Sequence, residues 1–486
     1  MHQYKGLYIN GDWSVAQGAV AEVVNPATEE IIGTVPIGGA REAESAIAAA
    51  RAAFDSGPWP HLTPQERCDV LDRFYALLAA RQDELEELIV AECGATKALA
   101  RIAHIGIAMD HFRFAVDEAR RREAITPVAP LVSAGPGGRG VLGSAVTIRE
   151  PVGVVSAITA FNYPFLINLA KIVPALLMGN TLVLKPSPYT PLQALVLGDL
   201  ATEAGIPPGV LNIITGGTEV GRAMTSDPRV DMVTFTGSES VGATVMAQAA
   251  PTIKRVHLEL GGKSALIACE DVDIEQVATQ AATGLVVQAG QGCGLCSRLL
   301  VHRSIMPSFI EVAKAVLESV VVGDPADPAT QMGPLIGNEQ RTRVTDMVDA
   351  AVRDGATVVT GGGRPPHLAK GFFYSPTLLT DVDNRDAIAQ DEIFGPVGMV
   401  IGFDTDDEAV ALANESRYGL SGAVWSADSG RAFALAQRLR TGAVRVNGGS
   451  AVEVPWGGYK RSGIGREYGA EGLDEYTEIK SITYRS

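Results

Sequence analysis

Cys293 has the surroundings of a reactive thiol. It lies in the segment Gly290-Gln291-Gly292-Cys293-Gly294, where small residues flank it on both sides. A substrate can approach a thiol in such a turn, whereas most cysteines are small buried hydrophobes. We therefore interpret Cys293 as a nucleophile, provided that other parts of the chain supply partners for it.

Three polar residues stand at the ends of apolar, strand-like runs and are candidate partners for the thiol. They are Asn162, Glu259 and Glu392. Each also has an ordinary structural explanation: Asn162 as a helix cap, Glu259 as a surface carboxylate and Glu392 as part of a turn salt bridge. For each residue alone we favour the structural explanation. Only the occurrence of all three together with Cys293 indicates a catalytic site.

The C-x-x-C spacing of Cys293 and Cys296 permits a redox pair or half of a metal site. The sequence has no second C-x-x-C, and His302 is the only histidine close to these cysteines. We therefore expect no metal. A reversible disulfide that protects Cys293 is a hypothesis that rests on this spacing alone.

Composition narrows the class of protein. The chain has 486 residues, which predicts two or three domains, and its net charge of -16 disfavours nucleic-acid binding. The five cysteines are too few and too scattered for a disulfide framework. The N-terminus lacks an apolar signal core, and no apolar run reaches the roughly 20 residues of a membrane span. We expect a cytoplasmic protein that does not bind membranes.

Residues 152–248 alternate short β-branched runs with helical segments, which predicts a parallel α/β sheet. A second alternation starts near Ser264, and helices are expected at 40–56 and 64–92. We predict two Rossmann-like parallel-sheet α/β domains and a small β oligomerisation element. The predicted boundaries are 1–127 with 149–260 for dinucleotide binding, 261–445 for catalysis, and 128–148 with 468–486 for oligomerisation.

Seven motifs occur along the chain in a specific order. They are Phe161-Asn162-Tyr163-Pro164, Leu184-Lys185-Pro186-Ser187, Phe235-Thr236-Gly237-Ser238, Leu258-Glu259-Leu260-Gly261-Gly262-Lys263, Gly290-Gln291-Gly292-Cys293, Glu392-Ile393-Phe394-Gly395-Pro396 and Pro455-Trp456-Gly457-Gly458-Tyr459-Lys460. With them, the chain resembles the aldehyde dehydrogenase superfamily over nearly its whole length. The resemblance implies an aldehyde dehydrogenase-like fold and a non-acylating, NAD(P)-dependent enzyme.

The resemblance also implies catalytic roles. The Cys293 thiolate would attack the aldehyde carbon, and the side chain of Asn162 with the backbone N–H of Cys293 would hold the oxyanion. Glu259 would activate the water that hydrolyses the thioester. Lys171 and Glu478 match positions of a proton path in relatives.

The expected cofactor is NAD, with NADP possible. The residues after Phe235 open a helix whose N-terminus suits a pyrophosphate. Pro188 stands where many NAD-dependent relatives carry a glutamate that would repel a 2′-phosphate, which leaves the preference open. The expected cofactor-binding residues are Ile158, Lys185, Ser187, Gly237, Ser238, Gly242, Leu260, Glu392 and Phe394.

Small residues predict a wide aldehyde channel. Ala170 replaces a large aromatic of many relatives, and Gly292 and Gly294 flank the nucleophile. With Tyr163, Leu166 and Trp456 as apolar walls, the expected substrate is a bulky, mainly apolar aldehyde, aromatic or of medium chain length. No arginine occupies the expected mouth positions, which disfavours a carboxylate-bearing semialdehyde.

Three alternatives to this reading stay open. A thiol esterase or hydrolase would use Cys293, Asn162 and Glu259 without a redox cofactor. A CoA-acylating semialdehyde dehydrogenase would release the thioester to CoA, although an intact Glu259 favours hydrolysis. A non-catalytic descendant of the fold is disfavoured by the retention of the same three residues. The expected partners are a small-molecule aldehyde and further copies of the chain, in a homodimer or homotetramer.

Overall fold

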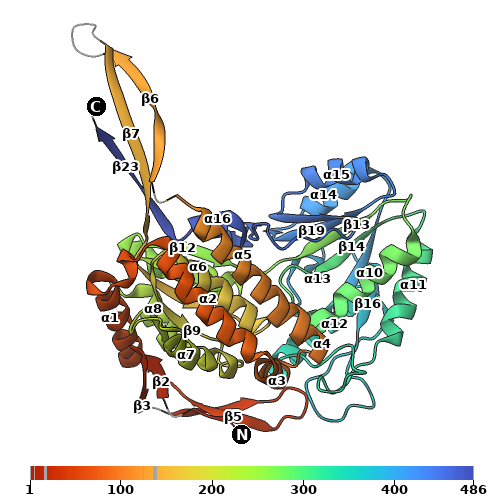
Figure 1. Cartoon of the computed structure of the whole chain (residues 1–486). Coiled ribbons are helices and arrows are strands. Elements are labelled where there is room, and N and C mark those ends of the chain that lie inside the picture. Colours follow the sequence, from red (N-terminus) through yellow and green to blue (C-terminus); the bar gives the residue numbers. More distant parts are fainter. Residues whose placement is uncertain (1, 5, 16–18, 124, 135–139, 485–486) are drawn as a thin grey trace.

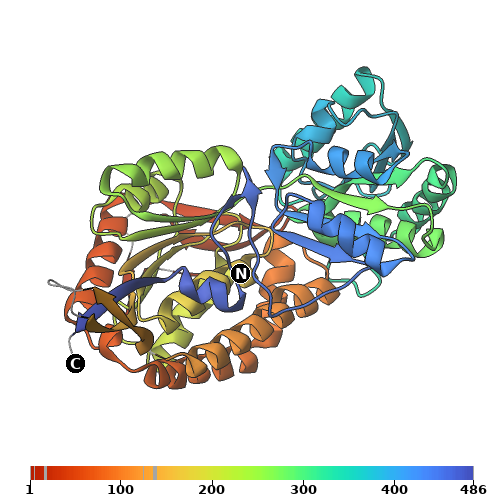
Figure 2. The same cartoon turned by 90° about the horizontal axis from the view of Figure 1, so that it is seen from above.

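The computed structural model describes residues 2–4, 6–15, 19–123, 125–134 and 140–484. Two lobes lie side by side, and a narrow β arm projects from one of them (Figures 1 and 2). Each lobe contains one large twisted sheet between helices, as the alternating sequence pattern predicts.

The first sheet has eight strands and carries the expected dinucleotide-binding motifs. Its five central strands, β12-β11-β8-β9-β10, are parallel, and antiparallel strands complete both edges. In spatial order the strands are β22 (Gly463–Ile464), β12 (Arg255–Glu259), β11 (Met232–Thr236), β8 (Val154–Ile158), β9 (Thr181–Lys185), β10 (Leu211–Ile213), β2 (Gly6–Ile9) and β3 (Asp12–Val15).

The second sheet has seven strands and carries the nucleophile segment. All neighbouring pairs are parallel except β15 with β16. In spatial order they are β15 (Thr357–Thr360), β16 (Thr377–Thr380), β17 (Val397–Phe403), β14 (Cys296–His302), β13 (Ser264–Ala268), β19 (Ser421–Trp425) and β20 (Ala443–Val446).

Helices cover both sheets. The helix predicted at 64–92 is two helices that meet at Arg81, whose φ of -110° and ψ of 15° are not helical. Thr63 caps the first of them as expected, because its hydroxyl accepts a hydrogen bond from the Glu66 backbone N–H. The first lobe contains α1 (Ala40–Ser56), α2 (Pro64–Ala80), α3 (Gln82–Cys93), α4 (Lys97–Leu99), α5 (Ile107–Arg121), α6 (Pro164–Leu177), α7 (Leu192–Ala204), α8 (Thr218–Ser226), α9 (Glu239–Ala249) and α16 (Gly469–Asp474). The second contains α10 (Ile274–Val286), α11 (Met306–Ser319), α12 (Asn338–Arg353), α13 (Ala387–Gln390), α14 (Asp406–Asn414) and α15 (Ser429–Arg438).

A three-stranded sheet forms the projecting arm. Strand β7 (Gly140–Pro151) pairs with β6 (Ile125–Ala134) and with β23 (Thr477–Tyr484), which is the expected tail strand. Residues 135–139 of the predicted oligomerisation element lie outside the described residues. Ile479 and Ile482 are exposed on the arm, so we propose that it contacts another copy of the chain. The shorter strands are β1 (His2–Gln3), β4 (Val20–Val24), β5 (Ile31–Pro36), β18 (Tyr418–Gly419) and β21 (Tyr459–Lys460).

A very short linker fixes how the two large sheets face each other. Strand β12 ends at Glu259 and β13 begins at Ser264, so the carboxyl edge of the first sheet lies against the amino edge of the second. The linker glycines are needed, because a Cβ at Gly261 would lie 2.1 Å from the Glu392 carboxylate and one at Gly262 would lie 2.5 Å from the Cys293 carbonyl oxygen. The predicted boundary near 260 falls in this linker. We propose that residues near 455–464 tie the lobes together a second time, since β21 pairs with β18 and β22 with β12.

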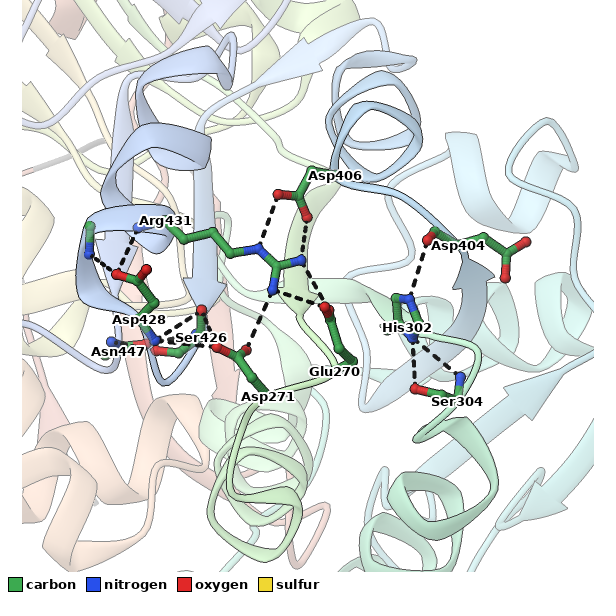
Figure 3. Close-up of polar contacts among 11 residues, drawn as sticks. Glu270, Asp271, His302, Ser304, Asp404, Asp406, Ser426, Asp428, Arg431 and Asn447 are labelled. Atoms are coloured by element: carbon green, nitrogen blue, oxygen red, sulfur yellow. Dashed lines mark hydrogen bonds and ion pairs between the residues drawn. The ribbon is translucent and has the colours of Figure 1, made fainter.

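The opposite, carboxyl edge of the second sheet is filled by ion pairs (Figure 3). The guanidinium of Arg431 contacts Asp406 at 2.6 Å and Glu270 at 2.9 Å. His302 lies at the same edge and contacts Ser304 at 2.8 Å. An α/β sheet usually binds ligands at its carboxyl edge. Here the charged side chains at that edge pair with one another.

Candidate active site

The predicted catalytic and cofactor residues converge where the two sheets meet. Glu259 ends β12, Ser238 follows β11, Asn162 follows β8 and Lys185 ends β9, so four neighbouring parallel strands deliver them to one edge. Cys293 reaches the same place from the other lobe, between a 3₁₀ turn (Val287–Gly290) and β14.

Cys293 is partly buried, and its surroundings disfavour the thiolate form. Burial, and then the nearby carboxylate of Glu259, raise the pKa of its thiol far above the usual range. Since only a thiolate is a good nucleophile, the thiol needs a base at the moment of attack. Cys296 begins β14 and is a free thiol, and burial raises its pKa to about 11.

Asn162 is held by the nucleophile segment itself. Its side chain is buried, and Nδ2 donates a hydrogen bond to the backbone oxygen of Gln291 at 3.0 Å. An amide nitrogen has two N–H groups, so one remains for a developing oxyanion. The buried Gln291 side chain donates to the Gln288 oxygen and accepts from the Ile336 backbone N–H, both at 3.0 Å. This supporting role of Gln291 is not apparent from the sequence.

The turn before the nucleophile is strained. Gln288 and Ala289 have φ values of 50° and 51°, which place two consecutive residues with side chains in the left-handed region. The Gln288 side chain crosses to the other lobe and donates to the Cys93 backbone oxygen at 3.3 Å. Strain of this kind persists only where surrounding contacts enforce it, and it often marks functional segments.

Glu259 is a buried carboxylate with few partners. Burial, and then the negative charge of Glu467, raise its pKa well above the usual value. The closest ionisable nitrogen on its own strand is His257 Nε2, 4.0 Å from Glu259 Oε1. A buried carboxyl group whose pKa is raised holds a proton more readily than an exposed one, which suits general base chemistry.

The structure corrects one predicted catalytic residue. Glu478 does not reach Lys171: it lies on β23, is 57% exposed and pairs with Arg255 at 3.0 Å. Instead, the buried Nζ of Lys171 contacts Glu467 Oε1 at 2.8 Å and Thr234 Oγ1 at 3.0 Å. The α6 position of Lys171 was predicted correctly, but the carboxylate that meets it comes from the loop before α16.

The Lys171–Glu467 pair is expected to be essential for stability. Replacing Lys171 with methionine leaves Glu467 buried without a counter-charge, which typically costs about 3–5 kcal/mol. We expect urea unfolding to show this loss. The control is Lys480→Met, which breaks the exposed pair with Glu150 and is expected to cost at most about 1 kcal/mol. Equal stability losses in the two variants would contradict the prediction.

The residues expected to hold a dinucleotide lie along the junction of the two sheets, and the region that they border is the expected cofactor space. Glu392 accepts a hydrogen bond from the Gly262 backbone N–H at 3.1 Å, and burial raises its pKa to about 7. Gly292, Glu392 and Phe394 line one pocket beside the nucleophile. Phe394 itself has a φ of 59°, which aims this turn into the cleft. A ribose diol facing Glu392 fits this arrangement.

The far end of the cofactor space also fits a dinucleotide. Burial lowers the pKa of Lys185 to about 8, and its Nζ donates to the Gly216 oxygen at 2.9 Å. Ile158 and Lys185 face Gly221 of α8, and a Cβ at Gly217 would meet no atom within 4 Å, so this end is open. Ser187 is buried, and its Oγ accepts from the Tyr189 backbone N–H at 3.3 Å.

Ser238 occupies the N-cap position of α9 without a capping hydrogen bond from its side chain, and the N-terminus of this helix faces the same junction of the sheets. Two of the glycines expected to bind the cofactor serve packing. A Cβ at Gly237 would lie 2.4 Å from Phe235, and one at Gly242 would lie 2.6 Å from Leu260. They let α9 approach the ends of β11 and β12.

The expectation that glycines widen the aldehyde channel is wrong. A Cβ at Gly294 would lie 2.5 Å from the Trp456 indole, and one at Gly292 would lie 2.6 Å from Leu295. Neighbouring side chains therefore occupy the space that each glycine leaves. Gly294 lets Trp456 pack directly on the nucleophile loop.

A separate apolar pocket does lie beside the predicted channel residues Leu166 and Ala170. It is formed between α5, α6 and α16, and its free volume is only about 30 Å³. The stacked rings of His111 and Tyr468, with centroids 3.7 Å apart, border it. Tyr163 lies nearby against His104, with ring centroids 4.8 Å apart.

One cation lies closer to the channel than the sequence indicated. Arg445 on β20 is exposed, and its charge partly offsets the effect of burial that raises the pKa of both Tyr163 and Cys296. The charge of Arg445 therefore acts on the segment that carries the nucleophile.

The described residues contain neither a metal-binding cluster nor a membrane-spanning helix. No group of three or more histidine, cysteine or acidic side chains there is arranged to hold a metal ion. None of the helices in those segments combines the length and the apolar character that a membrane crossing requires.

Comparisons with known proteins agree with this geometry. Residues 13–482 match the model of the aldehyde dehydrogenase family. The 3-succinoylsemialdehyde-pyridine dehydrogenase of a Pseudomonas species is 39% identical over 99% of both chains. The chloroplastic betaine aldehyde dehydrogenase of Beta vulgaris is 38% identical over 98% of this chain and 95% of its own.

Two solved structures are similarly close. The aldehyde dehydrogenase of Mycobacterium tuberculosis with NAD+ is 42% identical, with a TM-score of 0.94 over 99% of this chain and 98% of its own. A mutant aldehyde dehydrogenase C of Pseudomonas syringae with NAD+ and octanal is 39% identical, with a TM-score of 0.93 over 99% and 96%. The chain therefore belongs to the aldehyde dehydrogenase family, and it is an oxidoreductase that converts an aldehyde to a carboxylic acid.

Proposed function

We propose that this enzyme oxidises a neutral, elongated and mainly apolar aldehyde with NAD, through a thioester on Cys293. The observation that carries the proposal is the convergence of Cys293, Asn162 and Glu259 at one junction of the two sheets, beside a narrow apolar pocket.

The first half of the reaction forms a bond between Cys293 Sγ and the aldehyde carbon. The thiol proton passes to Glu259, whose carboxylate lies close enough to raise the pKa of the thiol. The free N–H of Asn162 and the backbone N–H of Cys293 hold the oxyanion. When bound, the dinucleotide supplies the acceptor for the hydride that leaves the former aldehyde carbon.

The second half releases the acid. Glu259 takes a proton from a water molecule, which attacks the thioester carbon, and the C–S bond breaks to regenerate the Cys293 thiol. Lys171 and Glu467 lie close to the buried Glu259, where the ammonium of Lys171 can stabilise its charge and the carboxylate of Glu467 can receive its proton. Glu392 and Lys185 orient the two riboses at opposite ends of the cleft.

The choice of NAD rests on relatives whose structures contain NAD+. Pro188 offers no carboxylate to repel a 2′-phosphate, so NADP should be tolerated. The enzyme should act as an oligomer through the β arm, in the cytoplasm.

The substrate class follows from the shape and charge of the channel. The pocket beside Ala170 is lined mainly by apolar side chains of α5, α6 and α16, so it favours an alkyl chain over a charged tail. The octanal complex of the Pseudomonas syringae relative supports this preference. The betaine aldehyde dehydrogenase relative points to a cationic substrate, but Arg445 opposes one here.

Ala170→Trp is expected to select against long aldehydes. The indole would fill the pocket between α5 and α6, so kcat/KM should fall at least about tenfold with octanal and change little with propanal. The measurement is reduced-nicotinamide absorbance over a panel of aldehydes, with NAD and NADP in parallel. Leu166→Met conserves volume in the same pocket and should retain octanal activity.

Three outcomes of this panel would contradict the proposal. Highest efficiency of the wild type with betaine aldehyde or an aminoaldehyde would overturn the neutral, apolar substrate. Turnover that requires CoA and yields an acyl-CoA would favour the acylating alternative. Ester turnover with no cofactor-dependent reaction would favour a hydrolase.

A further inference from the structure

His257 faces the general base from within the same strand. It precedes Glu259 by two positions on β12, so both side chains lie on one face of the sheet. Both are buried, and His257 Nε2 lies 4.0 Å from Glu259 Oε1. Among the described residues neither atom has another hydrogen-bond partner. Two buried polar atoms that face each other and have no other partner destabilise the fold unless they hydrogen-bond to each other.

A hydrogen-bonded chain favours the tautomer in which Nε2 of His257 carries the hydrogen. The Lys171 ammonium can only donate, so Thr234 Oγ1 accepts from it at 3.0 Å. The Thr234 hydroxyl then directs its own hydrogen to His257 Nδ1, 3.2 Å away. With Nδ1 as an acceptor, the neutral imidazole carries its hydrogen on Nε2, the atom that faces Glu259.

We propose that His257 is the positioning residue of Glu259, donating from Nε2 to the ionised carboxylate and holding Oε1 so that Oε2 is directed to water and the thiol. This rests on the role proposed above for Glu259. A small side-chain movement or a bridging water closes the 4.0 Å gap when Glu259 ionises. A donor that favours the carboxylate keeps the base ionised at lower pH.

The surroundings keep His257 neutral, as this role requires. Burial, then the positive charge of Lys171 and that of Arg466, lower its pKa well below the usual value. Gly465 packs against the imidazole, with Glu475 beside it. Glu259 itself also faces Glu467, Lys171, Arg466 and the Cys293 thiol, and the Tyr476 hydroxyl faces Thr234.

The test is the pH dependence of deacylation in the full-length enzyme. His257→Leu removes the donor, His257→Gln keeps an N–H near the Nε2 position, and Thr234→Val removes the group that fixes the tautomer. Steady-state kcat and the burst of reduced nicotinamide are measured with octanal and NAD, and hydrolysis of p-nitrophenyl acetate is followed without cofactor. The control is His302→Leu, at the remote edge of the second sheet (Figure 3).

In His257→Leu, we expect kcat to fall about tenfold at neutral pH. The acid limb of the kcat–pH profile of this variant should move to higher pH by about one to two units, which is the scale of one hydrogen bond to a charged group. The burst amplitude should persist, because attack and hydride loss precede this step. His257→Gln should recover most of kcat, and Thr234→Val should shift the limb in the same direction by less.

An acid limb in His257→Leu that coincides with that of the wild type would overturn the proposal. So would an equal shift in His302→Leu. If His257→Leu does not fold, Thr234→Val and His257→Gln still decide the question through the same profiles. Ester hydrolysis needs no cofactor, so a wild type that fails to oxidise aldehydes would refute the proposed function while the ester profiles still test His257.

Discussion

Cys293→Ala is expected to lower kcat for aldehyde oxidation by on the order of 10⁵-fold or more, the scale seen when an enzyme loses its nucleophile. Without Sγ no thiohemiacetal forms, and neither Asn162 nor Glu259 has an intermediate to act on. Binding of reduced nicotinamide, followed by its fluorescence, should persist, because the cofactor space is built from Lys185, Ser238 and Glu392.

The matched control for this experiment is Cys296→Ala. Cys296 is the next cysteine in the chain and begins β14, so its removal tests whether the pair acts together. We expect kcat to stay near the wild-type value. We also expect mild peroxide to inactivate the enzyme, through oxidation of Cys293, at an unchanged rate. Protection of Cys293 from irreversible oxidation by an intact Cys296 would instead support the disulfide hypothesis. Retention of activity by Cys293→Ala would remove the basis of the proposed mechanism.

Glu259→Gln should separate the two halves of the reaction. Glutamine cannot accept a proton, so thioester hydrolysis should slow by about 10²–10⁴-fold. The first turnover should still release reduced nicotinamide as a burst of up to about one equivalent per subunit, which stopped-flow absorbance can resolve. Glu478→Gln, the variant of the residue that the structure removes from the site, should leave both phases unchanged.

The same variant predicts a change in thiol chemistry. In the wild type, burial and then Glu259 raise the pKa of Cys293, so kcat/KM should rise with pH through the neutral range. Removing that negative charge lowers the pKa of the thiol and increases its thiolate fraction at any pH below it. Iodoacetamide should therefore alkylate Cys293 faster in Glu259→Gln at pH 8. Slower alkylation would show that Glu259 acts mainly by deprotonating the thiol.

The residues that are expected to contact the reacting atoms could be predicted from the sequence, because each belongs to a contiguous motif. Asn162, Glu259 and Cys293 converge as expected, and the two parallel sheets and the tail strand are present. Such motifs work because a strand end, a turn and a helix start together dictate where one side chain points.

Long-range partners could not be predicted in the same way. Lys171 meets Glu467 across 296 residues, and only the folded loop before α16 distinguishes Glu467 from Glu478. His257 could have been recognised, since a strand places i and i+2 on one face. The prediction of a wide channel from the glycines beside Cys293 failed because the absence of a side chain does not indicate which neighbour fills the space. Leu295 fills it at Gly292, and Trp456 fills it at Gly294.

The edge-to-edge arrangement of the sheets has a consequence for the electrostatics of the nucleophile. Helix α10 begins at the carboxyl edge of the second sheet and ends at Val286, just before the turn that carries Cys293. The nucleophile segment thus follows the C-terminal, negative end of a helix, whereas readily ionised thiols often lie at positive ends. With the burial and the negative charge around it, this placement keeps the thiol protonated more of the time, so the wild-type enzyme should resist chance oxidation and alkylation better than an exposed cysteine does.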